Sequence, residues 1–109
     1  MVETFTALAE PNRLRIVELL RDGARPVGAI CAELGMNQPQ ASKHLKVLKE
    51  ARLVAVEPRA QQRLYALRGD SLRELSDWLA SYRHLWEERF TQLDQLVAEL
   101  QKEEKENTP

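Results

Sequence analysis

The stretch NQPQASKHLKVL, residues 37–48, decides the fold of this chain. Asn37 is a predicted helix N-cap, and Gln40 three residues later completes a capping box. Pro39 is tolerated in the first turn, where the backbone N–H has no helical partner. A stripe of apolar residues at spacing i, i+4 and i+7 faces inward: Ala41, Leu45 and Leu48. The stretch therefore predicts an amphipathic helix over about 38–51.

A shorter helix precedes this one across a very short turn. Residues Val27–Leu34 carry apolar side chains at helical spacing, and Gly35 ends the helix in a conformation that glycine adopts without strain. Two helices joined so closely predict a helix-turn-helix over about 27–51. Upstream, Arg25-Pro26 is a break, and two more helices are expected, over Val2–Ala9 and from Pro11 to Asp22-Gly23.

Two short β-prone segments follow the helix-turn-helix. Residues 53–57 and 63–67 alternate in part between apolar and polar side chains, and Pro58–Gln62 joins them. They predict a two-stranded hairpin, or wing, over about 53–68. The connection contains no glycine, so the sequence leaves the turn geometry open.

The C-terminal third has the pattern of one long helix. Ser71 with Glu74 is a second predicted capping box, and neither proline nor glycine occurs from there to about Glu104. An apolar seam with heptad spacing, interrupted at Arg89, runs through Leu72, Leu75, Leu79, Tyr82, Trp86, Leu93, Leu96 and Leu100. It predicts a helix over about 71–104, about 50 Å long if continuous. The charged tail Gln101–Pro109 is expected to fray.

The expected fold class is therefore mainly α with a small β-hairpin. We expect a winged helix-turn-helix in one domain over 1–109, with a long C-terminal helix. A seam that extends past a compact body needs an apolar partner, and a second copy of the chain supplies one by symmetry. The alternative is that this helix folds back over the core as two shorter helices.

Composition and charge narrow the function classes. The 109 residues are 43% apolar and 30% charged, which is a globular balance for one domain. A lone cysteine, Cys31, excludes an intrachain disulfide, and neither a secretory signal nor an apolar run of membrane-helix length is evident. Residues 37–68 carry seven basic and two acidic side chains, whereas 69–109 carry five basic and ten acidic. A polyanion partner is therefore plausible for the middle third only.

The helix over 38–51 turns a polar face outward, opposite its apolar stripe. Helical geometry places Pro39, Gln40, Lys43, Lys46 and Val47 there, with Gln38 and Ser42 on the flank near the N-terminal end. The N-terminal residues of such a helix reach base edges in DNA. Gln40 can bond adenine bidentately and Lys43 can reach guanine, whereas Lys46 is placed for phosphate. Gln38 and Ser42 can contact either bases or phosphates. The alternative for each of these polar side chains is a solvated position on the surface of the helix.

The hairpin tip adds a second basic surface. Arg59, Gln61, Gln62 and Arg63 gather there, where arginines can follow a phosphate backbone or enter a minor groove. The alternative is a charged edge that prevents strands from pairing between molecules. His44 lies near the core boundary of its helix, so we expect a packed histidine rather than a DNA contact.

Three segments carry a family resemblance. FTALAEPNRLRI (residues 5–16), NQPQASKHLKVL (37–48) and RLYAL (63–67) resemble the ArsR/SmtB family of bacterial winged helix-turn-helix repressors, and the resemblance covers about residues 3–90. It implies a cytoplasmic homodimer that binds a palindromic operator, an inverted repeat in double-stranded DNA, and releases it on a signal. The inducer is not identified by the sequence.

The resemblance also implies site residues. It builds the dimer from the first and last helices, which here offer Phe5, Leu8, Leu72, Leu75, Leu79, Tyr82, Trp86 and Leu93. In relatives the second, third, sixth and seventh residues of the recognition motif contact DNA, and these are Gln38, Pro39, Ser42 and Lys43 in this chain. The chain departs from the family at Pro39, which has no N–H donor, and at Ala60, where many relatives carry glycine at the wing tip.

The metal sites of the family are incomplete in this chain. One uses Cys-x-Cys on the first helix of the helix-turn-helix, where Cys31 stands alone. The other uses Asp-x-His followed by His-x-x-Glu; His84 and Glu87 match the second half, but Ser71 and Arg73 occupy the first. We therefore expect no metal and no other cofactor.

Three classes of function remain to be ranked. The leading one is a sequence-specific DNA-binding transcriptional repressor. The alternative is a winged-helix interaction module that recruits a protein partner through its acidic C-terminal helix. An enzyme is not expected, because His44 and His84 lie on different predicted helices and neither a Gly-rich phosphate loop nor a nucleophile elbow occurs.

Overall fold

The computed structural model describes residues 1–106 and divides into two compact units, Met1–Leu75 and Ser76–Pro109. Mainly helical structure with one small antiparallel sheet confirms the predicted fold class. The first unit contains α1 (Val2–Leu8), α2 (Pro11–Leu20), β1 (Arg25–Pro26), α3 (Val27–Leu34), α4 (Gln38–Glu50), β2 (Val54–Arg59), β3 (Gln62–Leu67) and the start of α5 (Gly69–Ser81); the second contains the end of α5 and α6 (Arg83–Glu106). The single domain over 1–109 stays a prediction.

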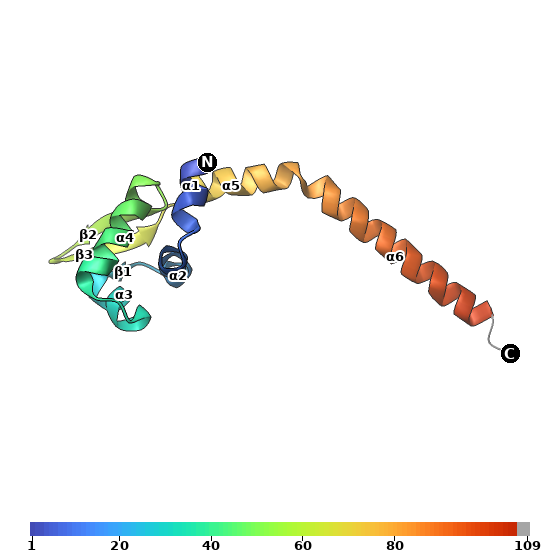
Figure 1. Ribbon diagram of the computed structural model, residues 1–109, viewed down its shortest axis with the longest axis horizontal. Helices are drawn as coiled ribbons and strands as arrows, with labels where there is room; N and C mark the ends of the chain where they lie inside the picture. Colours follow the sequence, from blue (N-terminus) through green and yellow to red (C-terminus); the bar gives the residue numbers. More distant parts are fainter. Residues whose placement is uncertain (107–109) are drawn as a thin grey trace. The chain divides into compact units, whose positions relative to one another are not determined.

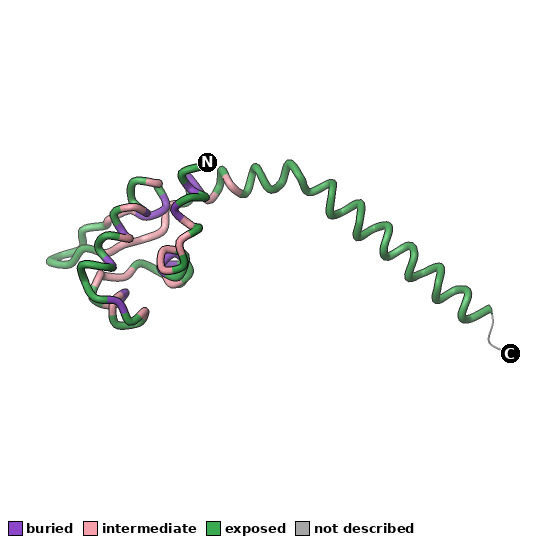
Figure 2. Tube along the Cα trace, viewed as in Figure 1, coloured by how far each residue is buried: buried purple, intermediate pink, exposed green. Residues whose placement is uncertain are grey.

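The core of the first unit lies where α2, α3 and α4 meet the sheet (Figures 1 and 2). The predicted inward stripe of α4 is confirmed, because Ala41, Leu45 and Leu48 are all buried. The largest fully buried side chains come from α2, α3, α4, β2 and the residue before β2: Ile16, Ile30, Leu45, Leu48, Leu53 and Val54. This burial fixes which face of α4 remains in solvent.

The sheet has three strands, in the order β1-β3-β2. The break predicted at Arg25-Pro26 is a two-residue strand, whose pairs are Arg25 with Tyr65 and Pro26 with Leu64. The wing is confirmed, but its strands are longer than predicted, and they meet at a two-residue turn, Ala60-Gln61, instead of a five-residue connection. Ala60 adopts φ +53°, which glycine tolerates better than other residues.

Both ends of the helix-turn-helix turn agree with the sequence. Gly35 takes the left-handed conformation, with φ +67° and ψ +34°, directly after α3. Asn37 Oδ1 accepts a hydrogen bond of 2.8 Å from the Gln40 N–H, so Asn37 caps α4 as predicted.

The C-terminal end of α4 uses a residue that the sequence does not mark. Arg52 has φ +61°, its N–H bonds the Lys49 carbonyl at 3.1 Å, and the Leu53 N–H bonds the Leu48 carbonyl at 3.0 Å. This pair of bonds is the Schellman motif, in which glycine is the usual left-handed residue. Leu48 and Leu53, both fully buried, make the apolar pair that accompanies the motif.

One prediction about the C-terminal third is wrong, and the structure answers a point that the sequence leaves open, the continuity of the long helix. Ser71 does not cap a helix, because α5 begins two residues earlier at Gly69 and the Ser71 hydroxyl bonds the Ala51 carbonyl. The helix is also not continuous, since Tyr82 separates α5 from α6. Just before this break, Ser81 Oγ donates to the Trp78 carbonyl at 2.6 Å, a bond that competes with helical pairing and bends helices.

The last helix, α6, buries none of residues 83–106 (Figure 2). The sequence predicts fraying over Gln101–Pro109, but α6 extends to Glu106, so residues 101–106 are helical. Residues 107–109 lie outside the described residues. Within the described chain, every helix is too short or too polar to cross a bilayer.

Candidate nucleic-acid interface

The solvent-facing side of α4 carries all five predicted reading residues. Exposed side chains on this helix include Gln38, Gln40, Ser42, Lys43 and Lys46. Helical geometry points Gln40, Lys43 and Lys46 away from the buried stripe and places Gln38 and Ser42 on its flank. The five exposed side chains thus share the solvent-facing side of the helix, and all but Lys46 occupy its N-terminal half.

One residue of the predicted outward face lies elsewhere. Val47 is half-buried and packs against the core, so its expected place beside Lys43 and Lys46 is wrong. It lines a shallow groove with Val2, Thr6 and Ala7 from α1. The first helix covers this side of α4, a tertiary contact that periodicity within α4 does not report.

A further feature of the five reading side chains is the lack of polar partners in the described part of the chain. Within residues 1–106, none of them has a side-chain hydrogen bond or ion pair to another protein group. Some other basic side chains do have acidic partners, since Arg25 pairs with Glu33 at 3.2 Å and Arg68 pairs with Asp70 at 2.8 Å. The α4 face thus keeps its donors and acceptors available for an external partner.

The turn that presents α4 is anchored by Arg15 of α2. Its Nη2 donates a hydrogen bond of 3.0 Å to the Leu34 carbonyl, which is one of the unpaired carbonyls at the end of α3. The Met36 N–H bonds the Cys31 carbonyl at 3.1 Å, and the Met36 side chain is buried. Arg15 is a positioning residue that sequence reasoning missed, since nothing in the local pattern indicates a partner nineteen residues away.

The middle of α4 lies against the start of α2, where His44 approaches Glu10. His44 is half-buried, which confirms the expected packed histidine, and its Nδ1 lies 3.7 Å from Glu10 Oε2. The same oxygen accepts a hydrogen bond of 2.9 Å from the Arg13 N–H and caps α2. This backbone bond is the main reason that the pKa of Glu10 lies below its ordinary value, with His44 and Arg13 adding smaller effects in the same direction and burial opposing them.

The wing presents its two arginines on opposite faces. Arg59, Gln61 and Arg63 are all exposed. The register pairs Arg59 with Gln62 and Pro58 with Arg63. Residues paired across a ladder share one face and successive residues alternate, so Arg59 and Arg63 project from different sides of the hairpin. Within residues 1–106 neither guanidinium has an ion-pair partner.

The predicted dimer residues divide into two groups. Leu8, Leu72 and Leu75 are half-buried, and the first two pack against the chain's own core. The other five remain exposed by 40% to 54% of their surface: Phe5, Leu79, Tyr82, Trp86 and Leu93. Their assignment to a dimer interface stays a prediction.

The possible metal ligands of the described residues do not gather into a site. Within residues 1–106, histidine, cysteine, aspartate and glutamate side chains nowhere form a group of three that could ligate one. His84 and Glu87 both line a shallow polar surface on α6, together with Glu88, Thr91, Gln92 and Gln95.

Comparisons with known proteins agree on one kind of protein. The family described as "Helix-turn-helix domain" matches residues 8–57. The HTH-type transcriptional regulator Rv2034 of Mycobacterium tuberculosis is 38% identical over 93 residues, which is 85% of this chain and 84% of that protein. The transcriptional repressor SdpR of Bacillus subtilis is 28% identical over 82 residues, which is 75% of this chain and 91% of that protein.

Solved structures give the same picture. The homodimeric winged helix-turn-helix DNA-binding domain Mb0332 of Mycobacterium bovis, described as a possible ArsR-family transcriptional regulator, has a TM-score of 0.62 and 33% identity. The match covers 74% of this chain and 78% of that one. A protein described as an ArsR family transcriptional regulator, RHA00566, has a TM-score of 0.68 at 26% identity, with 78% and 93% of the two chains covered.

Proposed function

The chain belongs to the ArsR/SmtB family of winged helix-turn-helix transcriptional regulators, and we propose that it represses transcription as a homodimer bound to an inverted-repeat operator. Regulators of this family bind DNA through the helix-turn-helix, so this chain is a DNA-binding regulator and its α4 is the recognition helix. The operator symmetry, the dimer and the individual contacts are our proposal.

The observation that supports the proposal is the exposed polar face of α4, whose five reading side chains make no hydrogen bond or ion pair within residues 1–106. Gln40 and Lys43 lie in the first two turns, where a recognition helix meets base edges, and we assign them to adenine and guanine. Gln38 and Ser42 flank them and contact bases or phosphates. Lys46, one turn further, neutralises a phosphate.

The wing supplies the second contact. Arg59, Gln61 and Arg63 lie on a narrow two-stranded hairpin whose tip is exposed. With arginines on both faces, the hairpin can meet the phosphates on the two sides of a minor groove. These contacts position the protein and make its affinity strongly dependent on salt.

A homodimer presents two copies of the recognition helix α4 to the DNA. Phe5 of α1 and Leu79 of α5 each offer exposed apolar surface to the partner, Leu8 and Leu72 pack against the core, and Leu75 is half-buried. The remaining interface residues are Tyr82, Trp86 and Leu93. A two-fold axis between two copies requires a two-fold repeat in the DNA.

The experiment is a gel shift on the upstream region of the gene, together with footprinting. The double variant Gln40→Ala, Lys43→Ala is expected to lose operator selectivity while remaining a dimer in ultracentrifugation. A matched control is Gln95→Ala, Lys102→Ala, which removes the same two residue types from exposed positions of α6. Protection of the same operator by the α4 variant would show that the assigned reading face is wrong.

Several further properties follow from this function. Binding chromosomal DNA places the protein in the bacterial cytoplasm, and it needs no cofactor and no membrane partner. If no shift occurs at low salt on any site selected from random DNA, the interaction-module alternative replaces the repressor.

A further inference from the structure

A hollow of about 350 Å³ lies where the first turn of α1, the end of α4 and the first two turns of α5 meet. All of its lining belongs to the first compact unit. This volume corresponds to roughly ten water molecules at about 30 Å³ each, so the hollow admits a ligand of about ten non-hydrogen atoms. The polar side chains that line it are Glu3, Thr4, Glu50, Arg52, Ser71 and Glu74.

Two buried hydroxyl groups form part of the wall of this hollow. Thr4 is 3% exposed and Ser71 is 7% exposed. Within residues 1–106 the Thr4 hydroxyl has no hydrogen-bond partner, and the little surface that Thr4 keeps opens into the hollow. Ser71 Oγ donates its one hydrogen to the Ala51 carbonyl, so it can only accept a further bond. Because buried polar groups are nearly always paired, the Thr4 hydroxyl indicates a partner from outside the chain.

Charged groups of both signs lie around these hydroxyls. The Met1 ammonium is 3.4 Å from Glu3 Oε2 and 3.4 Å from Glu74 Oε1. In the part of the chain that the structure describes, the Glu50 carboxylate and the Arg52 guanidinium have neither an ion pair nor a side-chain hydrogen bond. Three carboxylates against two cations leave a net charge of −1. The hollow therefore offers one unpaired group to a cation and another to an anion.

We propose that this hollow binds a free basic amino acid, with an ammonium group at Glu50 and the ligand carboxylate at Arg52. An ammonium group has three donors and no acceptor, which suits the Glu50 carboxylate together with the acceptor oxygens of Thr4 and Ser71. A guanidinium matches a carboxylate with two parallel hydrogen bonds. L-Lysine has about ten non-hydrogen atoms, which fits the volume. Its two ammonium groups and one carboxylate give the single positive charge that the lining lacks.

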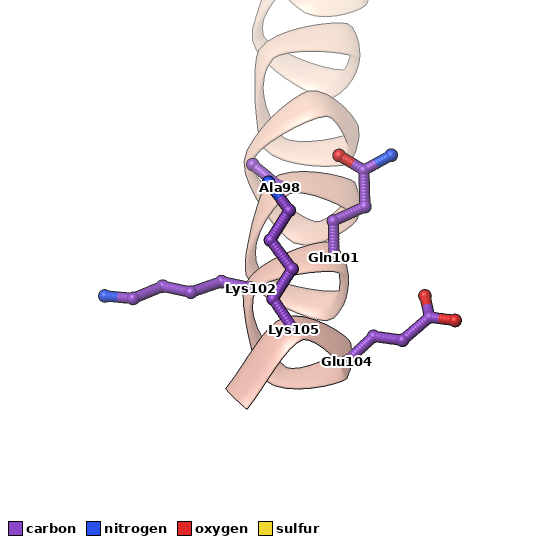
Figure 3. A pocket seen from close by; sticks show the side chains of 5 residues that line it. All are labelled: Ala98, Gln101, Lys102, Glu104 and Lys105. Atoms are coloured by element: carbon purple, nitrogen blue, oxygen red, sulfur yellow. The ribbon is translucent and has the colours of Figure 1, made fainter. Parts of the chain in front are cut away.

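The surface at the end of α6 has a different character. Figure 3 shows its five side chains, with Lys102 extending away from Gln101 and Glu104. All five come from one helix and spread around it, so they do not converge on a ligand. The hollow beside α1 differs because three separate elements supply its lining.

Titration calorimetry of the full chain with three related ligands tests the proposal. L-Lysine is expected to bind at least about ten times more tightly than L-norleucine, which lacks the side-chain ammonium group, and than cadaverine, which lacks the carboxylate. Each of these two ligands loses one of the proposed charge pairs. Equal affinities for the three ligands would overturn the proposal, as would the absence of saturable L-lysine binding up to roughly 10 mM.

Substitutions locate the binding in the hollow. Glu50→Gln is expected to weaken L-lysine binding at least about fivefold, and Thr4→Val, which removes the hydroxyl but keeps the shape of the side chain, about threefold. The matched control is Glu99→Gln, at an exposed position of α6, which should leave the affinity unchanged. Equal affinities of the Glu50→Gln and Glu99→Gln variants would show that the ligand binds elsewhere.

Arg52→Ala tests the orientation of the ligand. Only L-lysine has a carboxylate to lose a partner, so this variant is expected to bind L-lysine and cadaverine about equally. An unchanged preference for L-lysine would contradict the assigned contact at Arg52.

The outcomes separate this inference from the proposed function, on which it does not rest. A chain that binds its operator but no L-lysine refutes only the amino-acid site. A chain that binds L-lysine through Glu50 but no selected DNA site refutes only the repressor.

Discussion

The Ser71 hydroxyl donates a hydrogen bond of 3.0 Å to the Ala51 carbonyl, which ties the first turn of α5 to the residue that ends the recognition helix. Ser71 is only 7% exposed, so water does not replace this bond readily. The connection links the helix that carries proposed dimer residues to the helix that carries the proposed reading residues.

Removing this hydroxyl should lower stability. Ser71→Ala leaves the Ala51 carbonyl without that donor, and we expect the free energy of unfolding to fall by about 1 kcal/mol. Urea denaturation measures it, with Ser76→Ala at an exposed position of the same helix as the control. An equal effect of the two substitutions would show that the bond contributes nothing.

Replacing Arg52 by glycine should stabilise the protein. The left-handed φ of +61° costs a residue with a Cβ about 1 kcal/mol, and Arg52→Gly is expected to recover about that amount. Arg52→Ala retains the Cβ and should give no such gain, which separates relief of backbone strain from loss of the arginine charge. Thermal unfolding of the three proteins decides between these outcomes.

The two wing arginines should contribute independently to DNA affinity. Because Arg59 and Arg63 project from opposite faces, each substitution to alanine is expected to weaken operator and random DNA alike and to reduce the salt slope of binding by about one. The losses should add in the double variant. Gel shifts over a range of salt concentrations measure this, and an effect confined to one arginine would place only one face of the wing on the DNA.

Acid should remove the contribution of the Glu10 charge. In the folded state the pKa of this carboxyl lies below its ordinary value of 4.5, chiefly because the Arg13 N–H donates to it. The charge therefore stabilises the fold at pH values above the pKa of the unfolded state, and this stabilisation is lost as pH falls through the lower pKa of the folded state. Glu10→Gln keeps an oxygen acceptor for the cap but has no charge. The wild type should therefore exceed this variant in stability near neutral pH, and should lose the advantage as pH falls from the unfolded pKa through the lower folded pKa of Glu10.

That pH dependence is checked by urea denaturation of both proteins at a series of pH values. A constant difference across the acid range would show that the charge of Glu10 does not stabilise the fold. His44→Gln, measured in parallel, reports whether the nearby imidazole contributes to the same interaction.

The local sequence was sufficient for the helix-turn-helix and for the exposure of the five proposed reading residues of α4, but not for the place of Val47. The cap at Asn37, the left-handed Gly35 and the stripe of Ala41, Leu45 and Leu48 involve neighbours within one or two turns. Periodicity and capping therefore predict them, together with the exposure of Gln40 and Lys43 on the opposite face.

Other features required the folded chain. Pro26 becomes part of a strand only because Leu64, far along the sequence, lies beside it. Ser71 matches a capping pattern, yet its hydroxyl donates to the Ala51 carbonyl, twenty residues away. The turn between α3 and α4 is held by Arg15, for which the local sequence carries no signal.

The difference has a physical basis. Helix periods, caps and turns depend on dihedral preferences and hydrogen bonds over a few residues, so the chain specifies them wherever it lies. Strand partners, the half-buried Val47 and the anchoring of the turn depend on which distant groups packing brings within about 3 to 4 Å. The sequence determined which polar residues of α4 are exposed; the tertiary structure decided which groups hold that helix in place.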